Sequence, residues 1–258
     1  MRLTRVYVDA PLVPGTRITL EGSAASHVTR VLRLRTGDAL TLFNGRGGEH
    51  AASIDKSQAG VVTVAIGEHR AAERESPLAI TLAQGLSRGE RMDLVVQKAT
   101  ELGVTQLQPL LTERSVVRLD AQQAHRKLNH WHAIAVAACE QSGRNRLPEV
   151  MAPATLRDFL RTGGGRAAAG GQAAPAADAL AGTRLLLSPA AAVRIDEVPR
   201  PAGGVTLLIG PEGGLAEAEQ EAARTAGFIP VRLGPRVLRT ETAAIAALAL
   251  LQRQFGDL

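Results

Sequence analysis

The sequence predicts an α/β fold in which a parallel sheet with flanking helices follows a small β-barrel or sandwich. Three observations support this. Short strand-like segments separated by turn residues fill residues 1–72. Apolar strands alternate with helical segments over residues 73–258, and three strand–loop–helix units close the chain. The 258 residues, of which 45% are hydrophobic, suffice for two cores.

The first 72 residues contain three candidate strands and one candidate helix. Turn residues such as Pro14-Gly15 separate the strands, as in small barrels. Residues 26–34 could form a short helix running into a strand. The predicted strands are Arg5–Asp9, Ala39–Asn44 and Val61–Ile66.

The segment 73–77 is polar, ends in Pro77 and is a candidate linker. Beyond it, Ser87 and Glu90 have the capping-box spacing of a helix start, and apolar residues recur at helical spacing to Leu102. The predicted elements of this part are the strands Leu78–Gln84 and Leu107–Leu111 and the helix Gln122–Gln141.

Residues 163–182 are low in complexity and have no apolar face, which predicts a flexible surface loop. Three short strands then each lead into a loop, namely Arg184–Leu187, Val205–Ile209 and Ile229–Leu233. The last segment, Thr242–Phe255, is apolar nearly all round. Such a helix must be buried, in the core or at a subunit interface.

Composition excludes several classes of protein. A single cysteine, Cys139, cannot form an internal disulfide, and no apolar run is long enough for a membrane span. The N-terminus lacks the apolar segment of a signal peptide, so we expect a soluble, cytoplasmic protein. The formal charge of +5 favours a polyanionic partner, although an Arg-rich genome would produce the same balance.

The three terminal loops are the strongest candidates for a ligand site. Parallel strands bind ligands at their carboxyl ends, and glycine lets the backbone approach a ligand closely. The loop Gly210–Gly214 is not a G-x-G-x-x-G fingerprint, and no P-loop motif occurs. A single loop of this kind could be only a tight turn, but three in succession favour binding.

The ordered set of motifs resembles the bacterial 16S ribosomal RNA uridine-N3 methyltransferases of the SPOUT superfamily, along nearly the whole chain. The motifs that carry the resemblance are Leu208–Gly214, Leu233–Ala243, Gln97–Val104, Glu140–Arg144, His27–Arg33 and Phe43–Gly45.

The resemblance implies a SPOUT-type parallel sheet with a C-terminal trefoil knot in residues 73–258 and a PUA-like RNA-binding domain in residues 1–72. It also implies S-adenosylmethionine as cofactor, a homodimer, and 16S ribosomal RNA of the small ribosomal subunit as partner. The residues implied at the cofactor are Ser188, Ile209, Gly210, Pro211, Gly213, Gly214, Leu233, Gly234, Leu238 and Thr240.

Methylation at uridine N3 requires loss of the imide proton, by a general base or with a cation that stabilises the anion. Arg239 is the first choice for the cation and Arg236 the second. Glu212 is the preferred base by position, Glu241 is less favoured, and a structural role for Glu212 is equally compatible with the sequence.

Several arginines are candidate RNA phosphate contacts, although a solvated basic face would look the same. They are Arg5, Arg30, Arg33, Arg35, Arg114, Arg144 and Arg146.

Other chemistry-bearing residues favour structural roles. Cys139 lies in an apolar helical stretch, as expected of a buried inert thiol, and Trp131 is expected to pack. His130 and His132 face different directions on a helix, so no metal site is expected. Ala216 stands at an expected helix N-cap that it cannot fill, which should cost about 1 kcal/mol.

Two alternatives remain open. One is a SPOUT methyltransferase that acts on another RNA, such as transfer RNA, or at a ribose oxygen. The other is a non-catalytic RNA-binding assembly factor, against which the intact cofactor loops argue.

Overall fold

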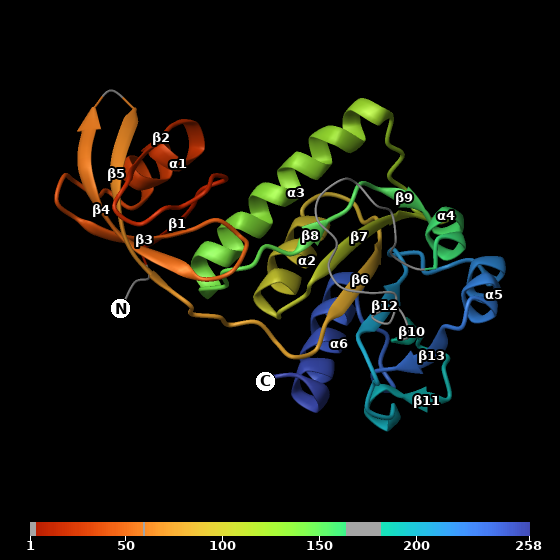
Figure 1. Cartoon of the computed structure of the whole chain (residues 1–258). Coiled ribbons are helices and arrows are strands. Elements are labelled where there is room, and N and C mark those ends of the chain that lie inside the picture. Colours follow the sequence, from red (N-terminus) through yellow and green to blue (C-terminus); the bar gives the residue numbers. More distant parts are fainter. Residues whose placement is uncertain (1–3, 59, 164–181) are drawn as a thin grey trace. The chain divides into compact units, whose positions relative to one another are not determined.

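The computed structural model describes residues 4–58, 60–163 and 182–258, and the chain divides into two compact units (Figure 1). Unit 1 comprises Met1–Glu75 and Val136–Leu147, and unit 2 comprises Ser76–Ala135 and Pro148–Leu258. No sequence pattern indicated that residues 136–147 group with the N-terminal strands. Most of the loop predicted at 163–182 lies outside the described residues.

Unit 1 is built on a curled five-stranded sheet in the order β1-β3-β4-β5-β2. Apart from the parallel pair β1–β3, the strands pair antiparallel. Its elements are β1 (Arg5–Tyr7), β2 (Arg17–Leu20), α1 (Gly22–Ser26), a π-helical turn (His27–Val31), β3 (Ala39–Phe43), β4 (Glu49–Gln58) and β5 (Val61–Arg70).

The three strands predicted in this region are confirmed as β1, β3 and β5, whereas β2 and β4 were missed. Apolar and polar residues alternate only weakly along β4, because its last residues are polar and exposed. The strand expected after the helix near Ser26 is wrong. There the chain turns at Arg33, whose φ is 57°, and the Leu34 N–H bonds back to the Val28 carbonyl at 3.0 Å.

Unit 2 contains an eight-stranded sheet in the order β11-β13-β10-β12-β6-β7-β8, with β9 also on β7, and every pair is parallel. Its strands are β6 (Ile80–Gly85), β7 (Gln106–Leu111), β8 (Glu149–Val150), β9 (Ala154–Thr155), β10 (Thr183–Leu187), β11 (Val193–Arg194), β12 (Val205–Ile209) and β13 (Ile229–Arg232). The parallel sheet expected from the alternating pattern is therefore confirmed.

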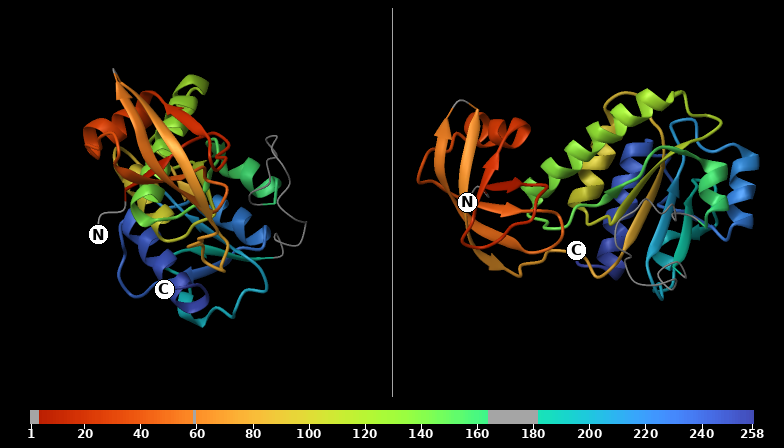
Figure 2. Two further views of the ribbon diagram at one scale, coloured as in Figure 1. Left: turned by 60° about the vertical axis from the view of Figure 1, so that its left-hand side comes forward. Right: turned by 45° about the horizontal axis from the view of Figure 1, so that its top comes forward.

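Helices cover both faces of this sheet, with α2 and α6 on one side and α4 and α5 on the other (Figures 1 and 2). The helical elements of this part of the chain are α2 (Arg91–Glu101), α3 (Ala121–Ser142, which belongs to unit 1 from Val136 on), α4 (Leu156–Arg161), a 3₁₀ turn (Ile195–Glu197), α5 (Glu217–Thr225) and α6 (Thr240–Phe255). The capping box expected at the start of α2 is absent, because the N-cap Glu90 makes no side-chain cap bond.

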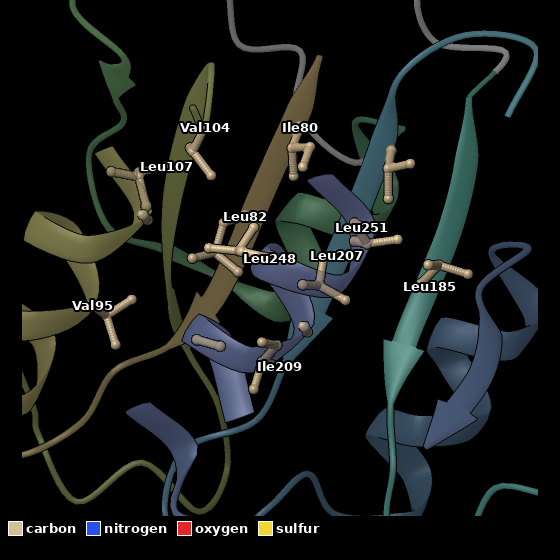
Figure 3. Packing of buried hydrophobic residues seen from close by; sticks show 14 of the residues in the cluster. Ile80, Leu82, Val95, Val104, Leu107, Leu185, Leu207, Ile209, Leu248 and Leu251 are labelled. Carbon is tan, nitrogen blue, oxygen red and sulfur yellow. The ribbon is translucent and has the colours of Figure 1, made fainter. Parts of the chain in front are cut away.

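Successive residues of a strand point to opposite faces of the sheet and pack into two separate cores. A sheet with helices on both faces can therefore bury near-continuous apolar runs. On β12, Leu207 and Ile209 join the cluster under α2 and α6, whereas Leu208 joins the cluster under α4 and α5. Figure 3 shows side chains of the first cluster from the sheet and from α6, among them Ile80, Leu82, Leu185, Leu207, Leu248 and Leu251. Truncating one such leucine to alanine typically costs about 2–5 kcal/mol.

α6 is only partly buried, although its composition is apolar nearly all round. Ala244, Leu248 and Leu251 are fully buried, whereas Leu250 is 40% exposed. Burial in the core is thus confirmed for one face, and a subunit interface for the other stays a prediction. In the described part of the chain, none of the helices has the length and apolar character needed to cross a membrane.

Candidate active site

A cavity of about 650 Å³ lies in unit 2 at the carboxyl ends of β10, β12 and β13. It is closed by the loops that follow these strands and by the first turn of α6. All ten residues predicted at the cofactor and all three predicted catalytic residues line it, namely Ser188, Ile209, Gly210, Pro211, Glu212, Gly213, Gly214, Leu233, Gly234, Arg236, Leu238, Arg239 and Thr240. The structure therefore brings together residues from three loops that are far apart in sequence.

Glycine shapes the loop after β12. A Cβ on Gly210 would lie 2.9 Å from the Gly214 carbonyl carbon, so no larger residue fits there without a shift. Gly214 has a φ of +67°, a region that favours glycine, and its N–H donates to the Pro211 carbonyl at 2.9 Å. Gly85 at the end of β6 is equally constrained, since its Cβ would lie 2.5 Å from the Pro211 nitrogen.

A buried polar network ties the first turn of α6 to this loop. The Thr240 hydroxyl donates to the Gly210 carbonyl at 2.7 Å, and the Gln84 amide donates to the Thr240 Oγ1 at 2.9 Å. Gln84 is fully buried, and sequence reasoning missed it. The available signal was a polar residue at the end of an otherwise apolar strand, because a buried amide requires partners.

Glu212 is held by two donors at the edge of the cavity. Arg91 Nη1 lies 2.6 Å from Glu212 Oε1, and the Arg88 backbone N–H donates to the same oxygen at 3.1 Å. Partial burial works against ionisation, but these hydrogen bonds and the one from its own backbone N–H hold the pKa of the Glu212 carboxyl below its ordinary value. The Glu212 carboxylate is thus ionised and already accepts hydrogen bonds from Arg88 and Arg91, which makes it a weak proton acceptor.

Glu241 lines the same cavity, but its carboxylate has fewer hydrogen-bond partners than that of Glu212. It is 8% exposed, and its Oε1 lies 3.9 Å from Arg91 Nε. Its other oxygen, Oε2, is buried and has no hydrogen-bond partner among the residues that the structure describes. A buried carboxylate oxygen normally finds a donor, so this atom lacks the partner that it would ordinarily have.

Arg236 and Arg239 are two cationic residues of the cavity whose side chains are not engaged elsewhere among the described residues. Both are exposed, and neither side chain forms an ion pair or hydrogen bond within the described part of the chain. Arg239 is the N-cap residue of α6 and directly precedes Thr240. Arg232 also lines the cavity, but it donates to the Ala191 carbonyl at 2.8 Å.

Two of the predicted RNA contacts require correction. Arg5 is 2% exposed and Arg144 is 3% exposed. Arg5 pairs with Glu49 at 2.5 Å, and Arg144 pairs with Glu75 through two hydrogen bonds of 3.1 and 2.5 Å. Both guanidinium groups serve the structure of unit 1 and are buried away from any phosphate.

The other five candidate RNA contacts are exposed, four of them in unit 1 and one in unit 2. Arg30, Arg33 and Arg35 follow one another in unit 1. Arg146 lies 3.6 Å from Glu73 in the same unit. Arg114 lines the cavity of unit 2, where its Nη1 donates to the Gly213 carbonyl at 3.1 Å.

The residues expected to be structural are placed as such. Cys139 is fully buried, and burial raises the pKa of its thiol to about 12, so the thiol is protonated and inert. Trp131 is 2% exposed, and its Nε1 donates to Asp93 at 3.1 Å. His130 bonds the same Asp93 at 2.8 Å.

The chain is similar to known RNA-modifying proteins along its length. Residues 74–252 match the RNA methyltransferase domain family, and residues 20–64 match the RNA methyltransferase PUA domain family. Ribosomal RNA small subunit methyltransferase E of Buchnera aphidicola is 34% identical over 257 residues, covering 100% of this chain and 98% of the relative. The protein of that name from Bacillus subtilis is 32% identical, covering 92% and 90%.

Two solved structures share the fold over both full chains. A methyltransferase from Legionella pneumophila in complex with S-adenosylmethionine is 42% identical with a TM-score of 0.89, and 100% of each chain is covered. Ribosomal RNA small subunit methyltransferase E from Neisseria gonorrhoeae, bound to S-adenosylmethionine, is 36% identical with a TM-score of 0.87 and the same coverage.

Proposed function

Because the chain belongs to the ribosomal RNA small subunit methyltransferase E family, we propose that it transfers the methyl group of S-adenosylmethionine to N3 of a uridine in 16S ribosomal RNA. The chain is thus an S-adenosylmethionine-dependent methyltransferase of small-subunit ribosomal RNA. The observation that carries the proposal is a cavity lined by glycine-rich loops and by two guanidinium groups, Arg236 and Arg239, that have no partner among the described residues.

The cavity suits S-adenosylmethionine in size and in lining. Its volume of about 650 Å³ lies within the range of small-molecule sites, about 300–1,000 Å³. Close approach to the backbone is possible at Gly234, where a Cβ would meet no atom within 4 Å. The ten predicted residues around Gly210 and Gly234 would hold the cofactor, which supplies an electrophilic sulfonium methyl group.

The protein must lower the cost of forming a nucleophilic N3. The imide proton passes to a carboxylate, and the negative charge that remains on the uridine is stabilised by a nearby cation. We assign the cation to Arg239, with Arg236 as the second group. Both guanidinium groups line the cavity and have no ion-pair partner within the described ranges of the chain, so no ion pair of the structure has to break.

The contacts favour Glu241 over Glu212 as the proton acceptor, although the sequence favoured Glu212. Glu212 already accepts from Arg91 and from the Arg88 backbone, whereas the Glu241 Oε2 has no partner among the described residues. We therefore assign the proton to Glu241, and to Glu212 the role of holding Arg91 in place.

Paired variants test this assignment. Glu241→Gln should lower the turnover number by about 10²–10⁴-fold, the range of general base catalysis, with cofactor affinity unchanged. Glu212→Gln should cost about tenfold or less, because it removes only a positioning contact. If Glu212→Gln had the larger effect at equal cofactor affinity, the two roles would be exchanged.

The proposal also extends to RNA binding, cellular location and oligomeric state. We propose that the PUA-like N-terminal part helps to hold RNA and that the active form is a cytoplasmic homodimer with its active site near the interface. The trefoil knot stays a prediction from the family resemblance.

The test is methyl transfer from labelled S-adenosylmethionine to isolated small subunits and to naked 16S ribosomal RNA, with the product nucleoside identified after digestion. We expect 3-methyluridine. A different methylated nucleoside, or transfer to transfer RNA alone, would support another substrate within the superfamily. Absence of cofactor binding would instead support a non-catalytic assembly factor.

A further inference from the structure

A second, more open hollow in unit 2, of about 440 Å³, is formed by five charged or polar residues and one leucine, and the side-chain carbons of these residues make up most of its surface. We call it the basic pocket, and it is lined by Arg118, Leu119, Gln123, Arg126, Lys127 and His130. We propose that the basic pocket binds backbone phosphates of the RNA substrate beside the target nucleotide. This inference rests on the proposed function, because it assumes that the substrate is RNA.

The basic pocket is a regular feature of the helix surface. Gln123, Arg126, Lys127 and His130 stand at positions i, i+3, i+4 and i+7 of α3, so they share one helix face. Trp131 and Ala135 of the same helix are buried in the core of unit 2. The polar face is therefore held in a fixed orientation by the apolar one.

The start of α3 is fixed by a reciprocal cap. The Gln123 backbone N–H donates to Asp120 Oδ1 at 2.7 Å, and the Asp120 backbone N–H donates to the Gln123 side chain at 3.0 Å. The Asp120 carboxylate is thereby engaged with the helix backbone. Asp93, the other acid near the pocket, bonds His130 and Trp131.

The three permanent cations of the pocket remain unneutralised. In the part of the chain that the structure describes, the side chains of Arg118, Arg126 and Lys127 form neither an ion pair nor a hydrogen bond. Other surface cations of unit 2 do pair, as Arg161 does with Asp158 at 3.4 Å and Arg224 with Glu221 at 3.0 Å. Three unpaired cations around one hollow repel each other unless an anion enters.

The basic pocket lies close to the proposed active site along the chain. Arg114 lines the main cavity, and Arg118 of the basic pocket follows four residues later. Four residues span at most about 14 Å even when fully extended. Cationic groups thus continue from the cofactor cavity to α3, which is the arrangement needed to follow a nucleic-acid backbone on either side of one base.

The test uses the full-length protein and a matched control. The triple variant Arg118→Ala/Arg126→Ala/Lys127→Ala removes three charges from the pocket. The control Arg157→Ala/Arg161→Ala/Arg224→Ala removes three charges from exposed positions elsewhere in the same unit. Binding of 16S ribosomal RNA is measured without cofactor at salt concentrations between about 50 and 200 mM, the range over which phosphate contacts are strongly screened.

We expect the pocket variant to bind RNA about tenfold more weakly and to flatten the slope of log Kd against log salt by about 2, since each lost contact on single-stranded RNA removes about 0.7. The Michaelis constant for RNA should rise, with turnover at saturating RNA unchanged. The variant Arg118→Lys/Arg126→Lys, which keeps the charge, should retain the wild-type salt slope.

Equal salt slopes for the pocket variant and the control would overturn the proposal. Loss of binding to phosphatidylserine-containing vesicles with unchanged RNA binding would also overturn it, in favour of a lipid surface. RNA binding is measured without methyl transfer. A failure of the proposed reaction would therefore leave the binding measurement valid, and the two failures can be told apart.

Discussion

Two arginines of unit 1 and two of unit 2 have opposite environments, although the sequence suggested RNA as the partner of all four. In unit 1, Arg5 and Arg144 are buried and each is bound to a carboxylate. At the cavity of unit 2, Arg236 and Arg239 are exposed and unpaired among the described residues. Residue type alone therefore does not identify a binding residue. What decides is whether the fold already supplies the counter-charge.

The buried network of unit 1 shows why Arg5 and Arg144 cannot serve a ligand. Removing a guanidinium from water is costly unless hydrogen bonds and a counter-charge replace the lost hydration. Arg5 meets this need with Glu49, the Arg144 carbonyl and Asn145, and it lies 4.7 Å from the ring centroid of Phe43. A phosphate would have to break these contacts.

The largest effect is expected from removing a buried arginine. Arg5→Ala leaves Glu49 buried without its main partner, so the stability of unit 1 should fall by about 3–5 kcal/mol. Hydrogen exchange resolved by unit measures this, with unit 2 as the internal reference. Arg17→Ala is the control, because its pair with Asp55 is solvent-exposed and should contribute less than about 1 kcal/mol. Equal effects of the two variants would contradict the structural role of Arg5.

Removing a cavity arginine should give the opposite result. Arg239→Ala should lower turnover by about 10²–10³-fold, as the loss of one transition-state charge donor does, and change stability by less than about 0.5 kcal/mol. Single-turnover methyl transfer and urea unfolding measure the two quantities. Arg224→Ala, on the exposed surface of α5, should change neither. Normal turnover of Arg239→Ala with intact cofactor binding would remove Arg239 from the mechanism.

The pH dependence of the stability of unit 1 is a second test of the ion pair between Arg5 and Glu49. Burial opposes ionisation of Glu49, but Arg5 and Asn145 outweigh it and hold its pKa below the ordinary value of 4.5. A lowered pKa stabilises the fold above that ordinary value, and this contribution is lost as the pH falls through the lowered pKa.

Glu49→Gln should therefore flatten the acid limb of the stability curve of unit 1. The free energy of unfolding is measured from neutral pH to below 4.5. Glu68→Gln, on the exposed end of β5, is the control and should leave the curve unchanged. A wild-type slope in Glu49→Gln would show that the ion pair with Arg5 does not drive the acid response.

The smallest effect is expected at the start of α5. The Glu219 carboxylate accepts from the Ala216 backbone N–H at 2.9 Å, but Ala216 makes no side-chain cap bond in return. Ala216→Ser completes the capping box and should stabilise unit 2 by about 1 kcal/mol, measured by urea unfolding. Ala222→Ser within the same helix should be neutral or slightly destabilising. No gain for Ala216→Ser would mean that the new hydroxyl does not reach the Glu219 N–H.

Sequence patterns predicted the parallel sheet and a ligand site at the three terminal loops, because apolar runs and glycine loops are local signals, and the family resemblance supplied the individual residues, all thirteen of which line the cavity. They missed Arg91 and Gln84, whose roles depend on partners more than a hundred residues away. They also misjudged Arg5, since its counter-charge, Glu49, lies on a strand whose polar residues hid it. Pairings between distant segments exist only once the chain has folded.

The claim that the three-loop cavity of unit 2 holds the cofactor is tested most directly by calorimetric titration of S-adenosylmethionine into the wild-type protein and Gly234→Ala. An added Cβ at Gly234 would meet no protein atom within 4 Å, so the fold should be unaffected while a methyl group stands in the cavity. We predict one bound cofactor per chain and an affinity about tenfold or more weaker in the variant, with unchanged unfolding. Equal affinities would contradict the assignment of this cavity.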